Sequence, residues 1–473
     1  MKKFTLLCLA LLTIQSSLSQ TTQKNRVIIL SDIEADPDDT QSFVRLFLYA
    51  NEIDIKGIVA TTSCWMQTTI NPNSIEKIVD AYGKIQPNLL KHQKDFPSAE
   101  ALRSIIKEGL PKYGMTGVGD GMDSEGSDWI ISELEKDDDR PLWISVWGGV
   151  NTLAQSLHKI KNTKSIKDAK KLISKLRVYT ISDQDDSGLW IRNNFPDVFY
   201  IVSPGDNYED ATWTGVNTFI KGIDNTTISN EWLADNIQQN HGPLGAIYPD
   251  VAWGVEGDTP AFLSLIPNGL NESEHPNWGS WGGRYELYKP DFSKTKKGNS
   301  IVEIGAEKRA IWTNAIDNYT PHIPSKYGRS VKPDSTSFTG FKETLWRWRD
   351  DFNNDFAARM DWCTMSFENA NHPPVPVLSH PQEFEVKSGQ AFTLDALDST
   401  DPDGDNLSFL WFHYPEESSY KEKINLGADN VHIVHATAPK VTKKETLHFI
   451  LKVTDKGSPA LSRYKRVIVT VTP

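Results

Sequence analysis

The sequence predicts an α/β protein with a doubly wound, mostly parallel sheet, followed by a small all-β, immunoglobulin-like sandwich. Strand and helix patterns alternate as far as Ser203, whereas short strand patterns alone follow the proline-rich segment His372–Pro376. A chain of 473 residues is also too long for one hydrophobic core, so more than one domain is expected.

The alternating part begins with 26–31 (RVIILS), a β-branched and apolar run typical of a strand buried on both faces. A helix is expected over 39–51, because Phe43, Val44, Phe47 and Leu48 recur at helical spacing. Parallel sheets of this kind place ligand sites in loops beyond the carboxyl ends of the strands. Further strands are expected at 53–61, 142–146, 177–181 and 199–203, and helices at 74–84 and 151–160.

The stretch from 208 to 327 is rich in Gly, Asn, Trp and Pro, and we interpret it as long functional loops of the same domain. A closing helix is expected over 341–362. Strands of the sandwich are expected at 392–394, 407–411, 446–453 and 466–471. The predicted domains are a signal peptide (1–20), the α/β domain (21–370), a proline-rich linker (371–376) and the sandwich (377–473).

Residues 1–20 have the three parts of a secretory signal: a positive start at Lys2 and Lys3, an apolar run, and a small-residue cleavage site. The run is too short to span a bilayer and no later segment has the length of a transmembrane helix, so we expect a periplasmic or secreted protein. Cys64 and Cys363 then remain, either as a disulfide or as two buried thiols. The net charge of −12 argues against nucleic acid as a partner. The oligomeric state is open, a dimer included.

The most informative stretch is 31–39 (SDIEADPDD), which carries five carboxylates in eight positions directly after the first strand. So many negative charges repel one another unless a cation or protons neutralise them. Carboxylate oxygens in this density suit Ca²⁺ or Mg²⁺. Capping of the next helix by Asp38 or Asp39 accounts for only one or two of them.

The spacing of Asp32, Glu34, Asp38 and Asp39 resembles the Asp-x-Asp-x-x-x-Asp-Asp cluster of nucleoside hydrolases. Gly148–Ala154 (GGVNTLA) is similar to their turn that supplies an oxygen to calcium, and Gly257-Asp258 to their late His-Asp pair. Nearly the whole mature chain resembles a related family, the nucleoside-hydrolase-like "cellulose-binding" family of bacterial polysaccharide degraders. The motifs that carry this second resemblance are Ser42-x-x-Arg45, LYANE at 48–52, TTS at 61–63, QD at 184–185, WGSWGGR at 278–284, WRWR at 346–349 and DFxxR at 355–359.

The resemblance implies that a cluster of oxygen ligands holds Ca²⁺ together with water and sugar hydroxyls. It implies that Glu34, or Asp32 if the register shifts, takes a proton from that water, and that Asp38 stabilises an oxocarbenium-like transition state. The sequence departs from nucleoside hydrolases at Glu34, where they have Asp, and at Gly257, where they have the His that protonates a purine leaving group. The implied metal ligands are Glu34, Asp39, Asn151 and Asp258.

Substrate contacts are expected from two further regions. Gln184 and Asp185 follow the strand at 177–181, although a solvated acidic loop is an equal alternative there, and Arg192 and Asn193 are similar cases. In the loop 271–284, Trp281 and Arg284 could wall a sugar subsite, the alternative being packing over the sheet. The acidic turn 401–405 (DPDGD) is interpreted as a plain turn rather than a calcium site.

Three functions are compatible with these patterns. The first is an exported glycoside hydrolase that acts on a furanoside or on a plant or algal glycan through a Ca²⁺-bound water. The second is a carbohydrate-binding protein without catalysis. The third is an extracytoplasmic nucleoside hydrolase, which the glycine at position 257 disfavours. The fold alone does not choose among them, because function resides in the site.

Overall fold

The structure, a computed structural model, describes residues 23–203, 208–291, 302, 305–324, 331–333 and 336–473. The predicted signal peptide lies outside the described residues. Among those described, no helix combines the length and the apolarity needed to cross a lipid bilayer. Cys64 and Cys363 are both buried and carry free thiols, which is the second of the two alternatives that the sequence left open.

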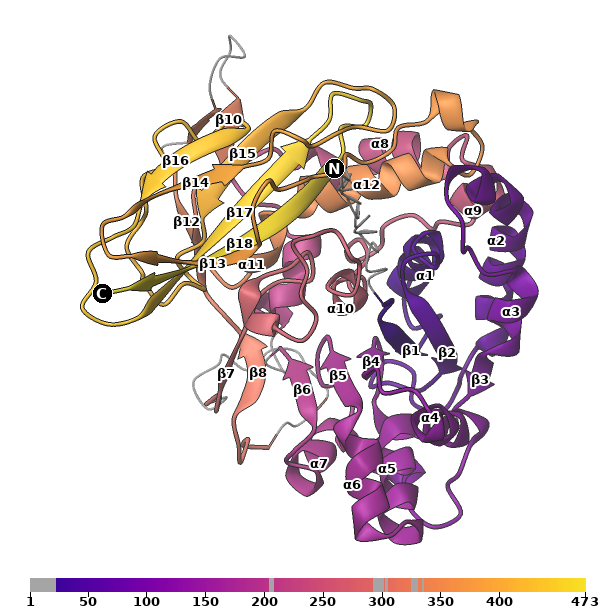
Figure 1. Ribbon diagram of the computed structural model, residues 1–473. Coiled ribbons are helices and arrows are strands. Elements are labelled where there is room, and N and C mark those ends of the chain that lie inside the picture. Colours follow the sequence, from indigo (N-terminus) through magenta and orange to yellow (C-terminus); the bar gives the residue numbers. More distant parts are fainter. Residues whose placement is uncertain (1–22, 204–207, 292–301, 303–304, 325–330, 334–335) are drawn as a thin grey trace, which may run out of the picture.

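The larger part of the chain is built on an eight-stranded sheet with the order β3-β2-β1-β4-β5-β6-β8-β7 (Figure 1). All neighbours are parallel except β7, which is antiparallel to β8. Because β2 and β4 flank β1 on opposite sides, the strand order reverses beside β1, and such switch points are where open α/β sheets bind ligands. The strands are β1 (Arg26–Ser31), β2 (Asp54–Ala60), β3 (Ile106–Glu108), β4 (Leu142–Val146), β5 (Leu176–Thr180), β6 (Phe199–Val202), β7 (Tyr285–Tyr288) and β8 (Ile311–Asn314).

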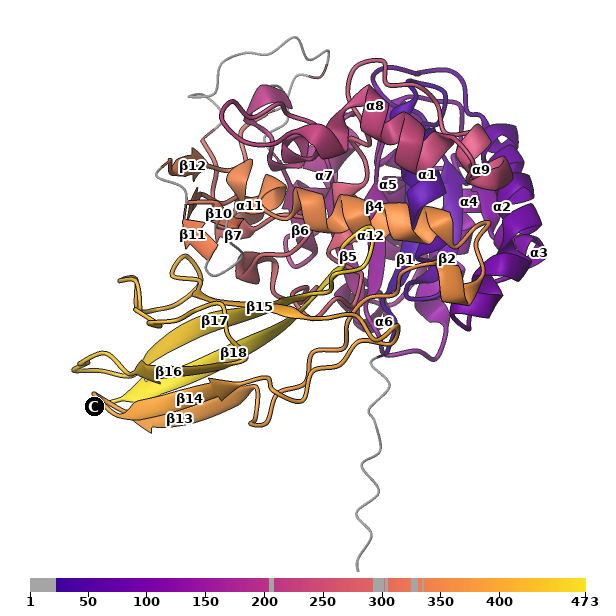
Figure 2. The same cartoon turned by 90° about the horizontal axis from the view of Figure 1, so that it is seen from above.

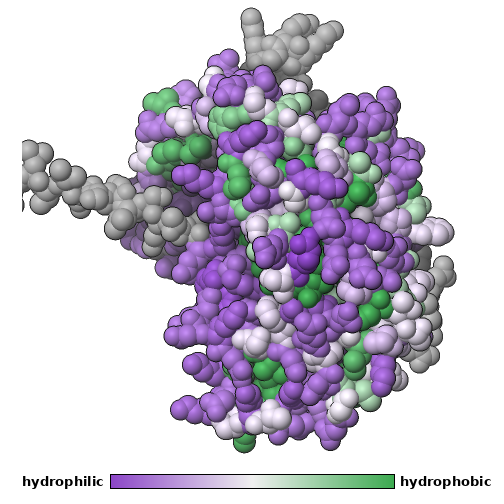
Figure 3. Space-filling view, turned by 90° about the vertical axis from the view of Figure 1, so that its right-hand side faces the viewer, coloured by the Kyte–Doolittle hydropathy of each residue, from purple (hydrophilic) through white to green (hydrophobic). Residues whose placement is uncertain are grey.

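Helices cover both faces of this sheet, as the apolar first strand predicted. Val27 and Ile29 of β1 belong to one core and Ile28 and Leu30 to the other. The first core also takes in α1 (Asp38–Leu48), α2 (Pro72–His92), α3 (Ala99–Ser104), α8 (Asn230–Leu233), α9 (Gly242–Ala246) and α10 (Pro260–Leu263). The second takes in α4 (Glu125–Glu135), α5 (Asn151–Thr163), α6 (Ile166–Ser174) and α7 (Ser187–Asn194). The side on which α2 and α3 lie is mainly hydrophilic, with apolar side chains in small separate groups (Figure 3).

The C-terminal part consists of two further sheets, and their shared core confirms the predicted sandwich. β13 (Glu383–Lys387), β18 (Ser462–Thr472), β17 (Glu445–Thr454) and β15 (Ser408–His413) form the first sheet. β14 (Ala391–Asp395) and β16 (Ile433–Thr437) form the second. Leu394 and Val434 from the smaller sheet and Phe449 from the larger one are buried in the same cluster.

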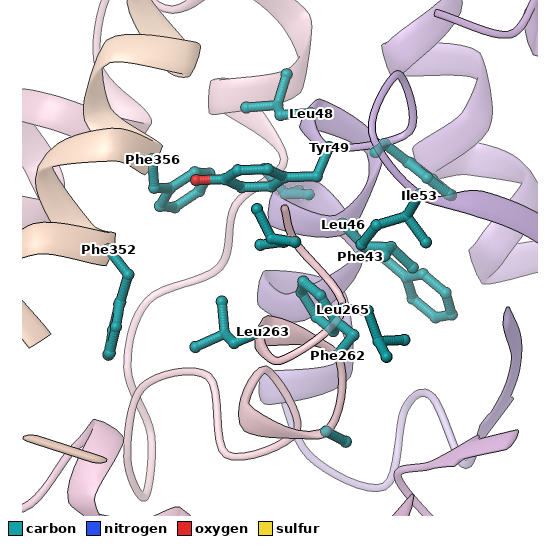
Figure 4. Packing of buried hydrophobic residues seen from close by; sticks show 14 of the residues in the cluster. Phe43, Leu46, Leu48, Tyr49, Ile53, Phe262, Leu263, Leu265, Phe352 and Phe356 are labelled. Carbon is teal, nitrogen blue, oxygen red and sulfur yellow. The ribbon is translucent and has the colours of Figure 1, made fainter. Parts of the chain in front are cut away.

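The predicted closing helix is divided into α11 (Glu343–Trp346) and α12 (Arg349–Asp361). Phe352 and Phe356 of α12 belong to the same buried cluster as Leu263 and Tyr49, the residue after α1, and Phe356 lies beside Tyr49 (Figure 4). The loop region also contains short strands that the sequence did not predict: β7 and β8 in the large sheet, and the pairs β9 (Asp317–Tyr319) with β12 (Phe338–Gly340) and β10 (His322–Pro324) with β11 (Val331–Pro333).

Buried ion pairs join α12 to the C-terminal sheet. Asp355 binds Arg463 of β18, and Asp351 accepts hydrogen bonds from Lys452 of β17 and Tyr464 of β18. The proline-rich segment is also packed rather than free, since His372 is buried and stacks on Phe367 with 3.9 Å between the ring centroids. The α/β part and the sandwich therefore pack directly against each other (Figures 1 and 2).

Candidate functional site

The acidic loop 31–39 lies between β1 and α1, at the switch point of the sheet. It is shaped by its own hydrogen bonds: Ser31 Oγ donates to the Asp39 carboxylate, and the Asp38 backbone N–H donates to Asp36 Oδ1 at 3.0 Å. These bonds place Asp38 and Asp39 in the first turn of α1, where the free N–H groups of a helix favour negative charge.

Asp258 joins this loop from the segment that precedes α10. Carboxylate oxygens of Asp38, Asp39 and Asp258 all lie within 4.8 Å of one another. The segment is held against α1, because Thr259 Oγ1 and Ser42 Oγ are 3.0 Å apart and Arg45 forms a buried ion pair with Glu256. The Ser42-x-x-Arg45 motif therefore positions the third carboxylate.

The three carboxylates fit a hard divalent cation. Asp258 is 2% exposed, and its Oδ2 has no hydrogen-bond partner in the protein. Burial and, after it, the neighbouring carboxylates raise the pKa of Asp39 and Asp258 well above the ordinary value. Oxygens that share one Ca²⁺ at about 2.3–2.6 Å lie at most about 5 Å apart, and the 4.8 Å spread meets that condition. A cation would satisfy the unpartnered oxygen and remove the cause of the raised pKa values.

Asp32 lies beside this cluster and shares its buried surroundings. It is 3% exposed, and burial raises its pKa to about 7. A carboxylate near neutral pKa is well matched to proton transfer at physiological pH. Gly148, two residues beyond the end of β4, allows the approach of Asp32, because a Cβ there would lie 2.6 Å from Asp32 Oδ1.

A small cavity of about 60 Å³ opens above the carboxylates. Residues that follow other strands complete its wall: Trp147 after β4 and Gln184 after β5 are linked by a 2.6 Å hydrogen bond from Gln184 Nε2 to the Trp147 carbonyl. The rings of Trp65, Tyr208 and Trp213 also line it. The ring centroid of Tyr208 lies 6.4 Å from that of Trp65 and 5.6 Å from that of Trp213. Aromatic rings beside carboxylates are a suitable surface for a sugar.

Two of the expected metal ligands are placed differently. Glu34 is exposed and adopts a positive φ of 80°, and Asp38 takes the place in the cluster that was expected for Glu34. Asn151 binds protein groups instead, since its Oδ1 accepts from Thr61 and its Nδ2 donates to the Lys112 carbonyl at 2.7 Å. We therefore leave Glu34 and Asn151 out of the proposed metal site.

Of the two substrate contacts expected after β5, one faces the cavity and the other does not. Gln184 lines the cavity, and its buried Oε1 has no partner in the protein. Asp185 accepts instead from the backbone N–H groups of Ser187 at 2.9 Å and Asn151 at 3.1 Å, so it fixes the starts of α7 and α5. Burial raises the pKa of Asp185 to about 6.

Four expected substrate contacts do not face the cavity. Arg192 is buried in an ion pair with Asp183 and Glu307, and Arg284 is buried in one with Asp317. Asn193 is exposed near the end of α7, which points away from the carboxyl ends of the strands. Trp281 has no exposed surface and packs against Tyr464. The packing alternative therefore describes Trp281, and we propose no sugar subsite there.

Sequence reasoning missed the aromatic residues of the cavity. Trp147 directly follows a predicted strand, which is the one signal that could have found it. Trp213 lies in a short 3₁₀ helix (Thr212–Val216) of the loop region and is held by a 3.0 Å hydrogen bond from its Nε1 to Ser182 Oγ. Nothing in the local sequence connects that loop to β5.

The fold and the carboxylate cluster at the switch point define a nucleoside hydrolase-like α/β protein with a C-terminal β-sandwich. The family described as "Cellulose-binding Sde182, nucleoside hydrolase-like domain" matches residues 26–285, and "Cellulose-binding protein Sde0182, C-terminal domain" matches residues 391–471. The chain therefore belongs to the Sde182 family of cellulose-binding, nucleoside hydrolase-like proteins, as its motifs predicted.

A solved relative covers almost the whole chain. It is a nucleoside hydrolase-related hypothetical protein from Saccharophagus degradans that is associated with carbohydrate metabolism, with 35% identity and a TM-score of 0.79 over 95% of this chain and 100% of that one. Two effector structures, XOO4466 and XopQ complexed with adenosine diphosphate ribose, each match 73% of this chain and 95% of their own. Their sequence identities are 9% and 10% and their TM-scores are 0.37 and 0.33, respectively. These likenesses are too distant to support a functional argument. No curated protein sequence matches.

Proposed function

We propose that the protein is an exported glycoside hydrolase that acts on a plant or algal glycan through its carboxylate cluster and a Ca²⁺ ion. The observation that carries the proposal is the buried, unpartnered Oδ2 of Asp258 beside Asp38 and Asp39. A site that only stabilised the fold would pair that oxygen with a protein donor, because an unsatisfied buried carboxylate oxygen is costly. Export rests on residues 1–20, and mass spectrometry of the secreted protein should find them removed.

Each residue of the site has a role in this proposal. Asp38, Asp39 and Asp258 would hold the cation, which acidifies bound water and orients sugar hydroxyls when present. Asp32 would accept the proton of the water that attacks the anomeric carbon while the glycosidic C–O bond breaks, and the leaving sugar oxygen would take its proton from a second water molecule. Gln184 has a free amide oxygen to receive a sugar hydroxyl. The rings of Trp65 and Trp213 would pack on the sugar face.

A glycan is a better substrate than a nucleoside. The family is described as cellulose-binding, and the solved relative is associated with carbohydrate metabolism. Gly257 also has no room for the histidine of a purine-cleaving site, since a Cβ there would lie 2.5 Å from Asp38 Oδ2 and 3.2 Å from the Trp213 ring. These contacts support a leaving group that is a sugar alcohol.

The test is product release from a panel of cellulose, other polysaccharides, aryl glycosides and nucleosides. We expect reducing sugar from at least one glycan and no free base from nucleosides. Asp32→Asn keeps the size of the side chain but removes the base, and should lower the rate by about 100-fold or more. Asp128→Asn is the matched control, because Asp128 is an exposed partner of Lys159. An Asp32→Asn enzyme with full activity would contradict the proposal.

A non-catalytic carbohydrate-binding protein is the second candidate. The small size of the cavity favours it, because about 60 Å³ is well below the roughly 300–1,000 Å³ of ordinary small-molecule sites. This candidate predicts that the protein sediments with insoluble cellulose, releases no product, and is unaffected by Asp32→Asn.

A further inference from the structure

A second and larger cavity lies where the α/β part meets the C-terminal sheet. Its volume is about 660 Å³, within the range of roughly 300–1,000 Å³ that ligand sites occupy. Asn25, immediately before β1, lines it, whereas Asp32 of the acidic cluster immediately follows β1. The two cavities therefore lie at opposite edges of the sheet. We call the larger one the interdomain cleft; its walls are 264–269, 271–273, 373–376 and 463–465.

Asn268 gives the interdomain cleft a donor without a partner. The residue is 2% exposed, and its Oδ1 accepts from the backbone N–H groups of Leu270 and Asn271, both at 2.9 Å. Its Nδ2 is buried and has no hydrogen-bond partner in the protein. The Asn268 carbonyl accepts from Tyr464 N–H at 3.0 Å, which fixes the residue to β18. A buried donor left unpaired is costly, so a ligand that supplies an acceptor would gain free energy from pairing with it.

The walls of the interdomain cleft suit a neutral, hydroxyl-rich ligand. Of the charged residues in the lining, Glu52 is paired with Arg359 and Arg463 with Asp355, and the other two, Glu272 and Lys465, carry opposite charges. Phe367 adds a half-buried aromatic ring, and the prolines of 373–376 add flat apolar surface. Amide donors beside flat apolar surfaces bind the hydroxyls and the C–H faces of sugars, whereas a phosphate-bearing ligand would need an excess of positive charge.

We propose that the interdomain cleft binds a segment of a neutral glycan chain, of the β-1,4-glucan class, separately from the acidic cluster. The proposal rests on the proposed action of the protein on glycans. Residues from both parts of the chain line the cleft, so it is complete only when the α/β part and the C-terminal sheet are docked together. The interdomain cleft would hold one segment of the glycan chain while the acidic cluster acts on another segment.

Calorimetric titration of the full chain with cellohexaose tests this site. Asn268→Asp keeps the Oδ1 that holds the two backbone N–H groups and removes the free donor, and should weaken binding about 10-fold or more. Phe367→Leu keeps apolar volume but removes the flat ring, and should weaken binding several-fold. It is the variant to use if Asn268→Asp proves unstable. Asn425→Asp is the matched control, because Asn425 is exposed, accepts from Gly427 N–H in the same way, and lies in the C-terminal part away from the cleft.

A variant of the acidic cluster, Asp258→Asn, separates the two proposals. The interdomain site is supported if Asn268→Asp or Phe367→Leu weakens binding while Asp258→Asn and Asn425→Asp bind like the unaltered protein. It is overturned if both cleft variants bind normally and Asp258→Asn loses binding, a result that leaves the proposed function intact. Failure of the unaltered protein to bind cellohexaose also overturns it, while hydrolysis of the wider glycan panel decides the proposed function independently.

Discussion

At the acidic cluster, two glycines leave room for carboxylates that a larger residue would displace. A Cβ at Gly148 would lie 2.6 Å from Asp32 Oδ1, and one at Gly257 would lie 2.5 Å from Asp38 Oδ2. Gly257 matches the position of a histidine in the nucleoside hydrolases that the sequence resembles. A glycine in place of that histidine removes a leaving-group acid and leaves room for the Asp38 side chain. In the proposed function, substrate preference and metal geometry would thus be coupled at one residue.

Gly257→Ala should weaken Ca²⁺ binding by about 10-fold or more, because the added methyl group displaces the end of the Asp38 side chain. The fold should survive, since the added methyl group would meet the end of a side chain rather than backbone, and circular dichroism should be unchanged. Calorimetric titration with Ca²⁺ measures the effect. Gly305→Ala is the control, because its Cβ would meet only the flexible end of Leu189. Unchanged Ca²⁺ affinity in Gly257→Ala would show that Asp38 is not a ligand.

Individual site residues could be predicted from the sequence only where a predicted strand end or a family motif marks their position. Asp38, Asp39 and Asp258 could be found because they follow strand ends or match a family segment. The outward turn of Glu34 follows from its positive φ of 80°, which a non-glycine residue rarely adopts and which no local pattern indicates. Likewise, the burial of Trp281 depends on Tyr464, 183 positions later in the chain, and no spacing rule reaches that far.

Among the elements, α12 has the largest role in joining the two parts of the molecule. Asp355 accepts a hydrogen bond from Tyr49, at the end of α1, at 2.7 Å and also binds Arg463 of β18. Burial acts to raise the pKa of Asp355, but the Arg463 and Arg359 guanidinium groups hold it below its ordinary value. The carboxylate therefore remains charged in the interior and connects three elements.

Asp355→Ala should lower the free energy of unfolding by about 3–5 kcal/mol, because it leaves Arg463 buried without its counter-charge and Arg359 with Glu52 as its remaining partner. Urea unfolding monitored by tryptophan fluorescence gives the value. In the control, Asp350→Ala, the lost contact is an exposed hydrogen bond from Thr227, and the expected change is below about 1 kcal/mol. Equal effects of the two substitutions would refute the assigned role of Asp355.

Element positions were predictable where apolar residues recur with a clear period. The strand expected at 26–31 is β1 residue for residue, and the apolar positions of the expected closing helix are indeed buried. The break between α11 and α12 was not predictable, because Trp346 and Trp348 continue the apolar pattern across it. β7 and β8 were missed because each has only four residues and takes its place in the sheet from tertiary pairing.

At the scale of the whole molecule, the α/β part and the C-terminal sheet share one hydrophobic core. Tyr414, Ile450 and Tyr464 of the C-terminal part belong to the same buried cluster as Phe43 and Phe352. A chain that ends at Pro376 would expose that core. We expect it to aggregate or to unfold without a cooperative transition, as measured by size-exclusion chromatography and scanning calorimetry. A monomer with one sharp transition would show that the C-terminal part is dispensable.

Two histidines of the C-terminal sheet are buried in neutral form and should contribute a stability that is lost in mild acid, whereas the raised pKa values of Asp32 and Asp185 act in the opposite direction. Burial lowers the pKa of His448 to about 3 and of His413 to about 4. The unfolded chain, with a histidine pKa near 6.5, therefore binds more protons than the folded chain below that pH. The stability is present above about pH 6.5 and is lost as the pH falls, by about 2 kcal/mol for each histidine between pH 7.5 and 5. Urea unfolding of His448→Gln should show a smaller loss over this range, and an equal loss would contradict the assignment.

A Ca²⁺ titration of the purified full chain tests the metal site most directly. Calorimetry should detect about one ion per chain, and Asp258→Asn should abolish that binding because it replaces the unpartnered carboxylate by an amide. Asp128→Asn should bind like the unaltered protein. A protein that takes up no Ca²⁺, or an Asp258→Asn variant that takes it up undiminished, would contradict a metal centre at Asp38, Asp39 and Asp258.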